Sequence, residues 1–118
     1  MARPLRIEYP GAFYHVMNRG NRGEDIFLTD TDRQVFLDGL ADSCETYCIK
    51  LFTYVLMTNH FHLFVQTPQA NRSEFMRHFL VTCTGRFNRR NGRTGHVFQG
   101  RFKSLLVEED EYLLTLSR

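Results

Sequence analysis

The sequence predicts one α+β domain of the ferredoxin-like kind, a split β-α-β arrangement in which helices cover one face of an antiparallel sheet. Three observations predict this fold. Strand-like runs and segments with helical spacing follow one another in the order strand, helix, strand, strand, helix, strand. The two middle strands are close enough to form a hairpin. No repeat, low-complexity tract or linker divides residues 1–118, so we expect a single domain.

The first strand and the first helix are marked by their ends. Residues 12–18 are rich in strand formers and run into the turn-like sequence Asn18-Arg19-Gly20-Asn21-Arg22-Gly23. Thr29 and Asp32 then have the spacing of a helix-capping box. The apolar residues that follow at helical spacing are Phe36, Leu37, Leu40, Ala41, Cys44 and Tyr47. They predict an amphipathic helix with an acidic outer face.

The middle of the chain predicts a hairpin that carries two histidines. The strand-like runs 50–57 and 60–66 are separated only by Thr58 and Asn59. Because side chains alternate along a strand, His60 and His62 point to one side of the sheet. The residues between and after them, Phe61, Leu63 and Val65, point to the other side and can anchor the strand in the core.

The second helix and the last strand close the pattern. Ser73 is the expected cap of a helix that runs to about Arg90 and stops at Asn91-Gly92. A basic, glycine-containing loop leads to a strand at 102–107. The acidic run 108–111 suits the N-terminus of a trailing helix, because negative charge there complements the helix dipole.

Charge is divided unevenly along the chain. From Glu24 to Tyr47 there are seven acidic residues against Arg33, whereas from Arg72 to Val107 there are eight basic residues against Glu74. This division gives a folded domain one face of positive potential, which attracts phosphate groups. Phenylalanines interleave with these bases at Phe79, Phe87, Phe98 and Phe102. Basic and aromatic residues together indicate a nucleic-acid partner rather than a merely solvated helix.

Other classes of protein are disfavoured by composition. The chain has no apolar run of membrane-spanning length and no signal-peptide pattern at its N-terminus, so a cytoplasmic protein is expected. Its three cysteines lack a C-x-x-C pair, which favours reduced thiols over a disulfide or a zinc site.

The histidine pair is the first candidate for chemistry. Two neutral imidazoles on same-face positions of a strand can reach one divalent cation if other groups complete its coordination shell. A single H-x-H pattern is weak on its own, and ordinary surface histidines are the competing interpretation. His15, on the first strand, can face either the core or a substrate.

The residues around the pair make the pattern more specific. Residues 55–65 read VLMTNHFHLFV and resemble the VLMPNHFHLLV segment of the HUH single-tyrosine transposases, the insertion-sequence-200-like class. Similar matches occur at Phe13-Tyr14-His15-Val16, Asn18-Arg19-Gly20-Asn21, Phe87-Asn88-Arg89-Arg90 and Gly95-His96-Val97-Phe98-Gln99-Gly100-Arg101-Phe102-Lys103. These matches lie in order and span nearly the whole chain. They are most similar to the branch associated with repetitive extragenic palindromes (REPs).

The resemblance implies a function. Members of this family bind a DNA hairpin and the adjacent single strand, and cut and rejoin that strand through a 5′-phosphotyrosine. By resemblance, His60 and His62 hold Mg²⁺ or Mn²⁺ at the scissile phosphate. The candidates for DNA contact, chosen for charge and position, are Arg19, Arg22, Arg86, Arg89, Arg90, Arg93, Arg101 and Lys103 for the backbone and Gln99 for a base. The sequence leaves open a monomer or a homodimer.

Two positions depart from the family pattern. Thr58 stands where proline is common. The family's nucleophile lies in a Tyr-x-x-x-Asn-Pro stretch, which alignment places just after Arg118, so we expect this chain to lack the end of its last helix and to bind DNA and metal without cutting. Tyr112 is the catalytic candidate within the chain, but it lies two helical turns earlier, and packing is the competing interpretation. The alternative function is a non-catalytic single-stranded DNA- or RNA-binding module, or a truncated transposase remnant.

Overall fold

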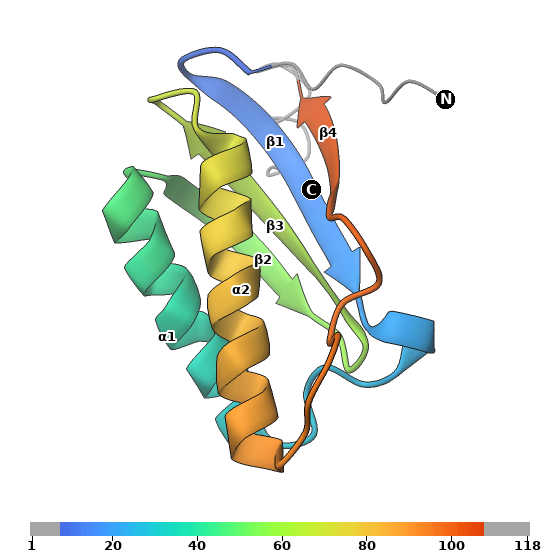
Figure 1. Ribbon diagram of the computed structural model, residues 1–118. Coiled ribbons are helices and arrows are strands. Elements are labelled where there is room, and N and C mark those ends of the chain that lie inside the picture. The colour runs from blue at the N-terminus through green and yellow to red at the C-terminus, as the bar shows by residue number, and fades with distance from the viewer. Residues whose placement is uncertain (1–7, 108–118) are drawn as a thin grey trace.

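A computed structural model describes residues 8–107, which form four strands, two long helices and a short 3-10 helix (Figure 1). In chain order these are β1 (Ala12–Arg19), η1 (Asn21–Gly23), α1 (Asp30–Tyr47), β2 (Lys50–Leu56), β3 (His60–Thr67), α2 (Arg72–Asn91) and β4 (Lys103–Val107). The trailing helix expected from residue 108 onward lies outside the described residues. Within residues 8–107, no helix combines the length and the apolar character that a membrane span needs.

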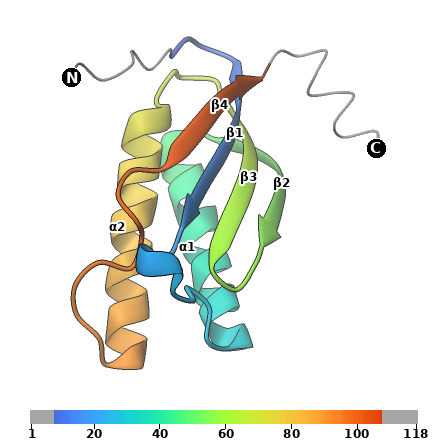
Figure 2. The same cartoon turned by 90° about the vertical axis from the view of Figure 1, so that its right-hand side faces the viewer.

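The strands form one antiparallel sheet in the order β2-β3-β1-β4. Helices α1 and α2 pack side by side on the same face of this sheet, as the two perpendicular views show (Figures 1 and 2). The crossover from β1 to β2 through α1 leaves room for β3 between them, and β4 returns along the free side of β1. The predicted α+β ferredoxin-like fold is therefore confirmed.

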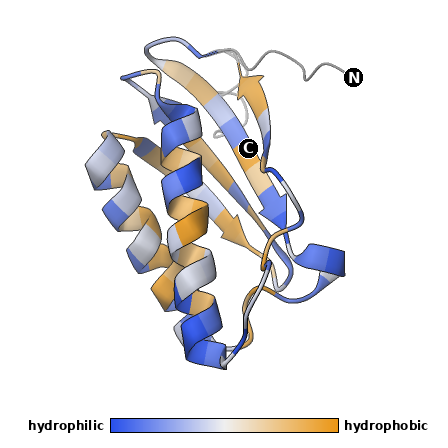
Figure 3. Cartoon of the chain, in the orientation of Figure 1, coloured by the Kyte–Doolittle hydropathy of each residue, from blue (hydrophilic) through white to orange (hydrophobic). Residues whose placement is uncertain are grey.

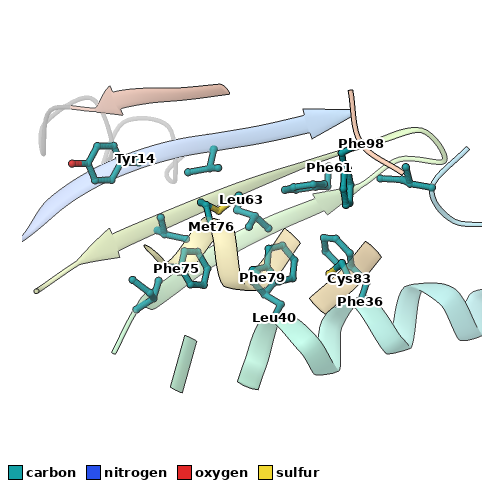
Figure 4. Close-up of a cluster of buried hydrophobic side chains, with 14 of the residues drawn as sticks. Tyr14, Phe36, Leu40, Phe61, Leu63, Phe75, Met76, Phe79, Cys83 and Phe98 are labelled. Atoms are coloured by element: carbon teal, nitrogen blue, oxygen red, sulfur yellow. The ribbon is translucent and has the colours of Figure 1, made fainter. Parts of the chain in front are cut away.

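The core lies between the sheet and the two helices (Figure 4). On the sheet side, Tyr14 and Phe61 are fully buried, because each occupies a position whose side chain points toward the helices. On α2, Phe75, Met76 and Phe79 recur at helical spacing and are also fully buried. Burial of these large apolar side chains supplies most of the favourable free energy of folding.

The helix ends agree with prediction at α1 and differ at α2. Thr29 caps α1, since its Oγ1 accepts a hydrogen bond from the backbone N–H of Asp32 at 3.2 Å. The expectation that Ser73 caps the second helix is wrong, because α2 begins at Arg72 with Asn71 in the capping position. Ser73 instead donates from its backbone N–H and its hydroxyl to Glu8 Oε1, both at 2.8 Å.

Asp32 joins the start of α1 to the end of α2. Its carboxylate accepts hydrogen bonds from the backbone N–H of Leu28 and from the side chains of Arg90 and Asn91. Burial alone would raise the pKa of Asp32, but these hydrogen bonds outweigh it and hold the pKa below its usual value. The ionised carboxylate therefore fixes the two helices to each other at this end.

The second face of the sheet carries the histidines. Buried and half-buried residues alternate along β1 and β3, so Tyr14 and Phe61 face the helices while His15, His60 and His62 face away. Among the described residues, neither helix covers this second face, which we call the open face (Figure 2).

Candidate active site

His60 and His62 lie side by side at the start of β3 on the open face. Their ring centroids are 5.1 Å apart, with the rings nearly perpendicular to each other. Phe61, between them, is fully buried against Phe36, Phe79 and Phe98. Because this phenyl ring is fixed in the core, the backbone on either side of it is fixed too, and the two imidazoles keep their relative position.

The ring of His60 is oriented by Asn59. Its Nδ1 lies 2.8 Å from Asn59 Oδ1, and Asn59 Nδ2 donates to the carbonyl of Gly23 at 3.5 Å. That second bond places the amide oxygen, an acceptor, against the imidazole, so Nδ1 of His60 is the protonated nitrogen. The neutral ring then has its lone pair on Nε2, the nitrogen that remains available as a ligand.

His62 is held by a residue whose orientation the sequence left open. His15 lies opposite Phe64 in the β1–β3 register and diagonal to His62, so it faces the open side rather than the core. Its Nε2 is 2.8 Å from Nδ1 of His62. Burial, and then a neighbouring imidazole, lower the pKa of both His15 and His62, which keeps both rings neutral near pH 7.

A groove surrounds the histidine pair and gathers several of the predicted site residues. It has a volume of about 500 Å³ and is lined by Met17, Asn18, Arg19, Asn59, His60, His62, Gln99, Arg101 and Lys103. Arg19 donates from Nε to Gln99 Oε1 at 2.9 Å, which ties the two sides of the groove together. The structure thus brings together both predicted metal ligands and four of the predicted DNA contacts, which lie far apart in sequence.

The loop that carries Gln99 is fixed to the end of β1. Gly20 and Phe98 form an isolated antiparallel bridge, and the backbone N–H of Gln99 donates to the carbonyl of Arg19 at 2.9 Å. Phe98 is buried in the core beneath this bridge. The loop therefore behaves as a short extension of the sheet, and it positions Gln99 and Arg101 beside the histidines.

Gly20 permits this crossing of chain segments. A Cβ atom at Gly20 would lie 1.9 Å from the carbonyl oxygen of Glu24, a backbone atom that cannot move aside cheaply. Its N–H also donates to the carbonyl of Asn59 at 2.8 Å. The glycine is required here by close backbone approach, since its own φ of −62° is one that any residue adopts.

The remaining predicted DNA contacts lie elsewhere. Arg86 and Arg90 on α2 form ion pairs with Asp42 and Asp32 of the α1 segment, at 3.6 and 3.3 Å. Arg89, also on α2, donates to its own helix at the carbonyl of Gly85. These three arginines belong to the helix layer and do not line the groove.

Two further predicted contacts lie at the same end of the molecule as the groove. Arg22 is exposed in η1, and Arg93 lies over the ring of Phe87 while lining a shallow surface depression next to Gly23 and Glu24. Figure 3 shows that η1 and the last turn of α2 are both hydrophilic. The structure therefore divides the predicted DNA contacts into three sets. The groove set is Arg19, Gln99, Arg101 and Lys103, and the outer set is Arg22 and Arg93. The third set is the three arginines of the helix layer.

Comparison with known protein families decides the family. The family model for IS200-like transposases matches residues 9–118. The chain belongs to the IS200-like transposase family. No curated protein matches the sequence at a significant level.

Solved structures share the fold of this transposase. A REP-associated tyrosine transposase bound to a REP hairpin superposes with a TM-score of 0.76 at 17% identity, over 98% of this chain and 68% of the other. A candidate transposase from Deinococcus radiodurans R1, determined at 1.90 Å resolution, gives a TM-score of 0.67 at 15% identity, over 99% and 92%. At these identities the likeness establishes the fold.

The histidines of this transposase are chemically suited to a divalent cation. Nδ1 of each ring is within hydrogen-bond distance of a protein group, and in the tautomer that donates through Nδ1 the lone pair is on Nε2, the nitrogen that can bind a cation. Within residues 8–107 no three His, Cys, Asp or Glu side chains gather as a metal-binding group. Tyr112, the catalytic candidate, lies outside the described residues.

We predict that replacing Gly20 by alanine destabilises the transposase by about 1–3 kcal/mol, because the added methyl group must displace the backbone at Glu24. Denaturant unfolding measures this difference. Gly85→Ala is the matched control: an alanine there meets only a side-chain atom of Arg89 at 4.0 Å, and helix propensity should make the change neutral or stabilising by up to about 1 kcal/mol. Equal stability of Gly20→Ala and wild type would show that the crossing tolerates a side chain.

Proposed function

We propose that this transposase cuts and rejoins single-stranded DNA in a metal-dependent reaction that passes through a 5′-phosphotyrosine, and that it binds a DNA hairpin beside the cut. The observation that carries the proposal is the pair His60 and His62, placed together in a groove with Arg19, Arg101 and Lys103. A metal-binding pair beside three cations is suited to a phosphodiester, whose charge is negative before and during the reaction.

The metal would be held by His60 and His62 through their Nε2 atoms, with water and phosphate oxygens as further ligands. Oxygen-rich coordination of this kind suits Mg²⁺ or Mn²⁺. When bound, such a cation offsets the negative charge on the phosphate oxygens. The protein's own contribution is to orient the two imidazoles, which Asn59 and His15 do through the hydrogen bonds at Nδ1.

The DNA strand would enter the groove along its basic side. Arg101 and Lys103 are exposed and follow the loop that the Gly20–Phe98 bridge fixes, so they can pair with backbone phosphates next to the metal. Gln99 presents an amide that can pair with a base edge. The outer set at the same end of the molecule would contact the DNA beyond the cut. A hairpin is a suitable partner there, since the REP-associated transposase of the same fold is bound to one.

The nucleophile would be a tyrosine hydroxyl. In the proposed step the tyrosine oxygen attacks phosphorus, the bond to the 3′-oxygen breaks, and the products are a 5′-phosphotyrosine and a free 3′-hydroxyl, which conserves the phosphodiester energy for rejoining. From the resemblance to the family pattern, we infer that this tyrosine would follow Arg118. Tyr112 is the weaker candidate, because it lies well before that position in the sequence.

A second candidate function is binding of single-stranded nucleic acid without chemistry. Aromatic side chains on the open face favour it: Phe13 and Phe52 lie 5.9 Å apart, and Phe64 lies against His15. Bases stack on such rings with little dependence on sequence. The histidine pair has no role in that function, so loss of metal binding would leave nucleic-acid binding intact.

We predict that Mn²⁺ binds the transposase through the histidine pair. Calorimetric titration of wild type and His60→Ala/His62→Ala should show binding that the double variant lacks. Binding requires a neutral His62, and burial, followed by the neighbouring His60, holds the pKa of His62 below 6.5, so protonation of His62 should weaken the affinity only below that pH. Binding of equal strength by the double variant would remove the metal assignment.

We predict that the groove set controls the salt dependence of DNA binding. Arg101→Ala/Lys103→Ala should reduce the log–log salt slope by about 0.7 for each phosphate that the variant no longer neutralises, measured by fluorescence anisotropy with a single-stranded oligonucleotide that carries a hairpin. Arg86→Ala is the matched control, because its guanidinium pairs with Asp42 and should leave the slope unchanged. A change of slope in Arg86→Ala alone would indicate that the DNA binds at the helix layer instead of the groove.

We predict that Tyr112 is not the nucleophile. With Mn²⁺ and a labelled hairpin-bearing strand, the 118-residue chain should bind but form no covalent adduct on a denaturing gel, since a nucleophile misplaced by even about 1 Å can lose a hundredfold in rate. A version extended through the Tyr-x-x-x-Asn-Pro stretch should form the adduct, and Tyr112→Phe should leave that adduct unchanged. An adduct from the 118-residue chain that disappears in Tyr112→Phe would make Tyr112 the nucleophile.

A further inference from the structure

The position of the proton in the hydrogen bond between His15 and His62 decides whether His62 can bind a metal. Two neutral imidazoles joined through Nε2 of one and Nδ1 of the other share a single proton. If His62 donates, its Nε2 has a lone pair. If His15 donates, Nε2 of His62 carries the hydrogen and cannot act as a ligand.

The geometry of the two rings supports a hydrogen bond rather than simple packing. The nitrogens are 2.8 Å apart, and the ring centroids are 4.9 Å apart with an interplanar angle of 25°. Rings stacked face to face at this centroid distance would not bring two nitrogens so close. The imidazoles therefore lie nearly in one plane, edge to edge, as a nitrogen-to-nitrogen hydrogen bond requires.

The position of His15 is fixed by two neighbours. Its ring stacks on Phe64 with centroids 4.7 Å apart and an interplanar angle of 8°, and its backbone is paired with Phe64 on β3 and with Leu105 on β4. The ring is half-buried in this setting. His15 therefore presents Nε2 to His62 from a rigid sheet position rather than from a mobile loop.

We propose that His15 is a positioning residue that accepts a hydrogen bond from Nδ1–H of His62 and so selects the tautomer whose Nε2 binds the metal. The inference rests on the proposed metal site. Asn59 plays the corresponding part for the other histidine, because its Oδ1 accepts a hydrogen bond from Nδ1–H of His60. In both His60 and His62, Nδ1–H then donates to a protein acceptor, and Nε2 keeps the lone pair that can bind the cation.

Two substitutions at His15 separate the hydrogen bond from packing. His15→Phe keeps an aromatic ring against Phe64 but removes the acceptor. His15→Gln places an amide oxygen at about the reach of Nε2, and this oxygen can accept the same hydrogen bond from Nδ1–H of His62. Loss of an outer partner of a metal-binding histidine commonly weakens metal binding by about 10-fold to 100-fold, so we expect that loss in His15→Phe and most of the affinity restored in His15→Gln.

The test combines calorimetry with Mn²⁺ and long-range ¹H–¹⁵N spectra of the metal-free protein, which show which nitrogen of His62 carries the hydrogen. The expected wild-type spectrum has Nδ1 of His62 protonated, and His15→Phe should shift His62 toward the Nε2-protonated form. His78→Gln is the matched control: His78 hydrogen-bonds Ser43 between the two helices, and its loss should change neither Mn²⁺ affinity nor the His62 spectrum. Thermal unfolding confirms that each variant is folded.

The outcomes distinguish this inference from the metal site itself. If His62→Ala weakens Mn²⁺ binding and His15→Phe does not, the metal site stands and the role of His15 is overturned. Protonation of Nε2 on His62 in the wild-type protein would also overturn it. If His62→Ala binds Mn²⁺ as tightly as wild type, the proposed metal site fails and the role of His15 fails with it.

Discussion

The pairing of β1 with β3 is the constraint on which the site depends. Because side chains alternate along both strands, a single register decides which residues reach the core and which reach the open face. Tyr14 and Phe61 fix that register by burial, and the same register then places His15 diagonal to His62. A slip of one residue would exchange the apolar and histidine faces, so the packing of the core also protects the geometry of the site.

The end of this strand pair shows how a distant loop becomes part of the same surface. Gly20 lets the chain pass close to Glu24 and bridge to Phe98, while the carbonyl of Thr58 accepts hydrogen bonds from Ile26 and Phe27. The turn of the β2–β3 hairpin is therefore held from outside by the segment that follows β1. Rigid support of this kind suits the proposed reaction, because a small displacement of a reacting group costs a large part of the rate.

Charge is arranged differently on the two sides of the molecule. On the helix side, acids of α1 and arginines of α2 face each other, and Asp32 with Arg90 is the most buried of these pairs. On the groove side, Arg19 is hydrogen-bonded to the neutral Gln99, and Arg101 and Lys103 are exposed. A surface whose cations face neutral groups keeps more of its positive potential for a polyanion than one whose cations are already paired.

The sequence by itself determined the fold class, the hairpin and the same-face placement of His60 and His62, because these follow from local periodicity and from the two-residue repeat of a strand. Its motifs also pointed to the family that the comparison with the family model established. It misplaced the cap of α2, where Ser73 binds the distant Glu8, and it grouped Arg86 and Arg90 with Arg101 and Lys103 because all belong to one basic stretch. Only the tertiary structure separated these arginines, and only it showed that His15 meets His62, since such contacts depend on strand order and helix packing between residues far apart in the chain.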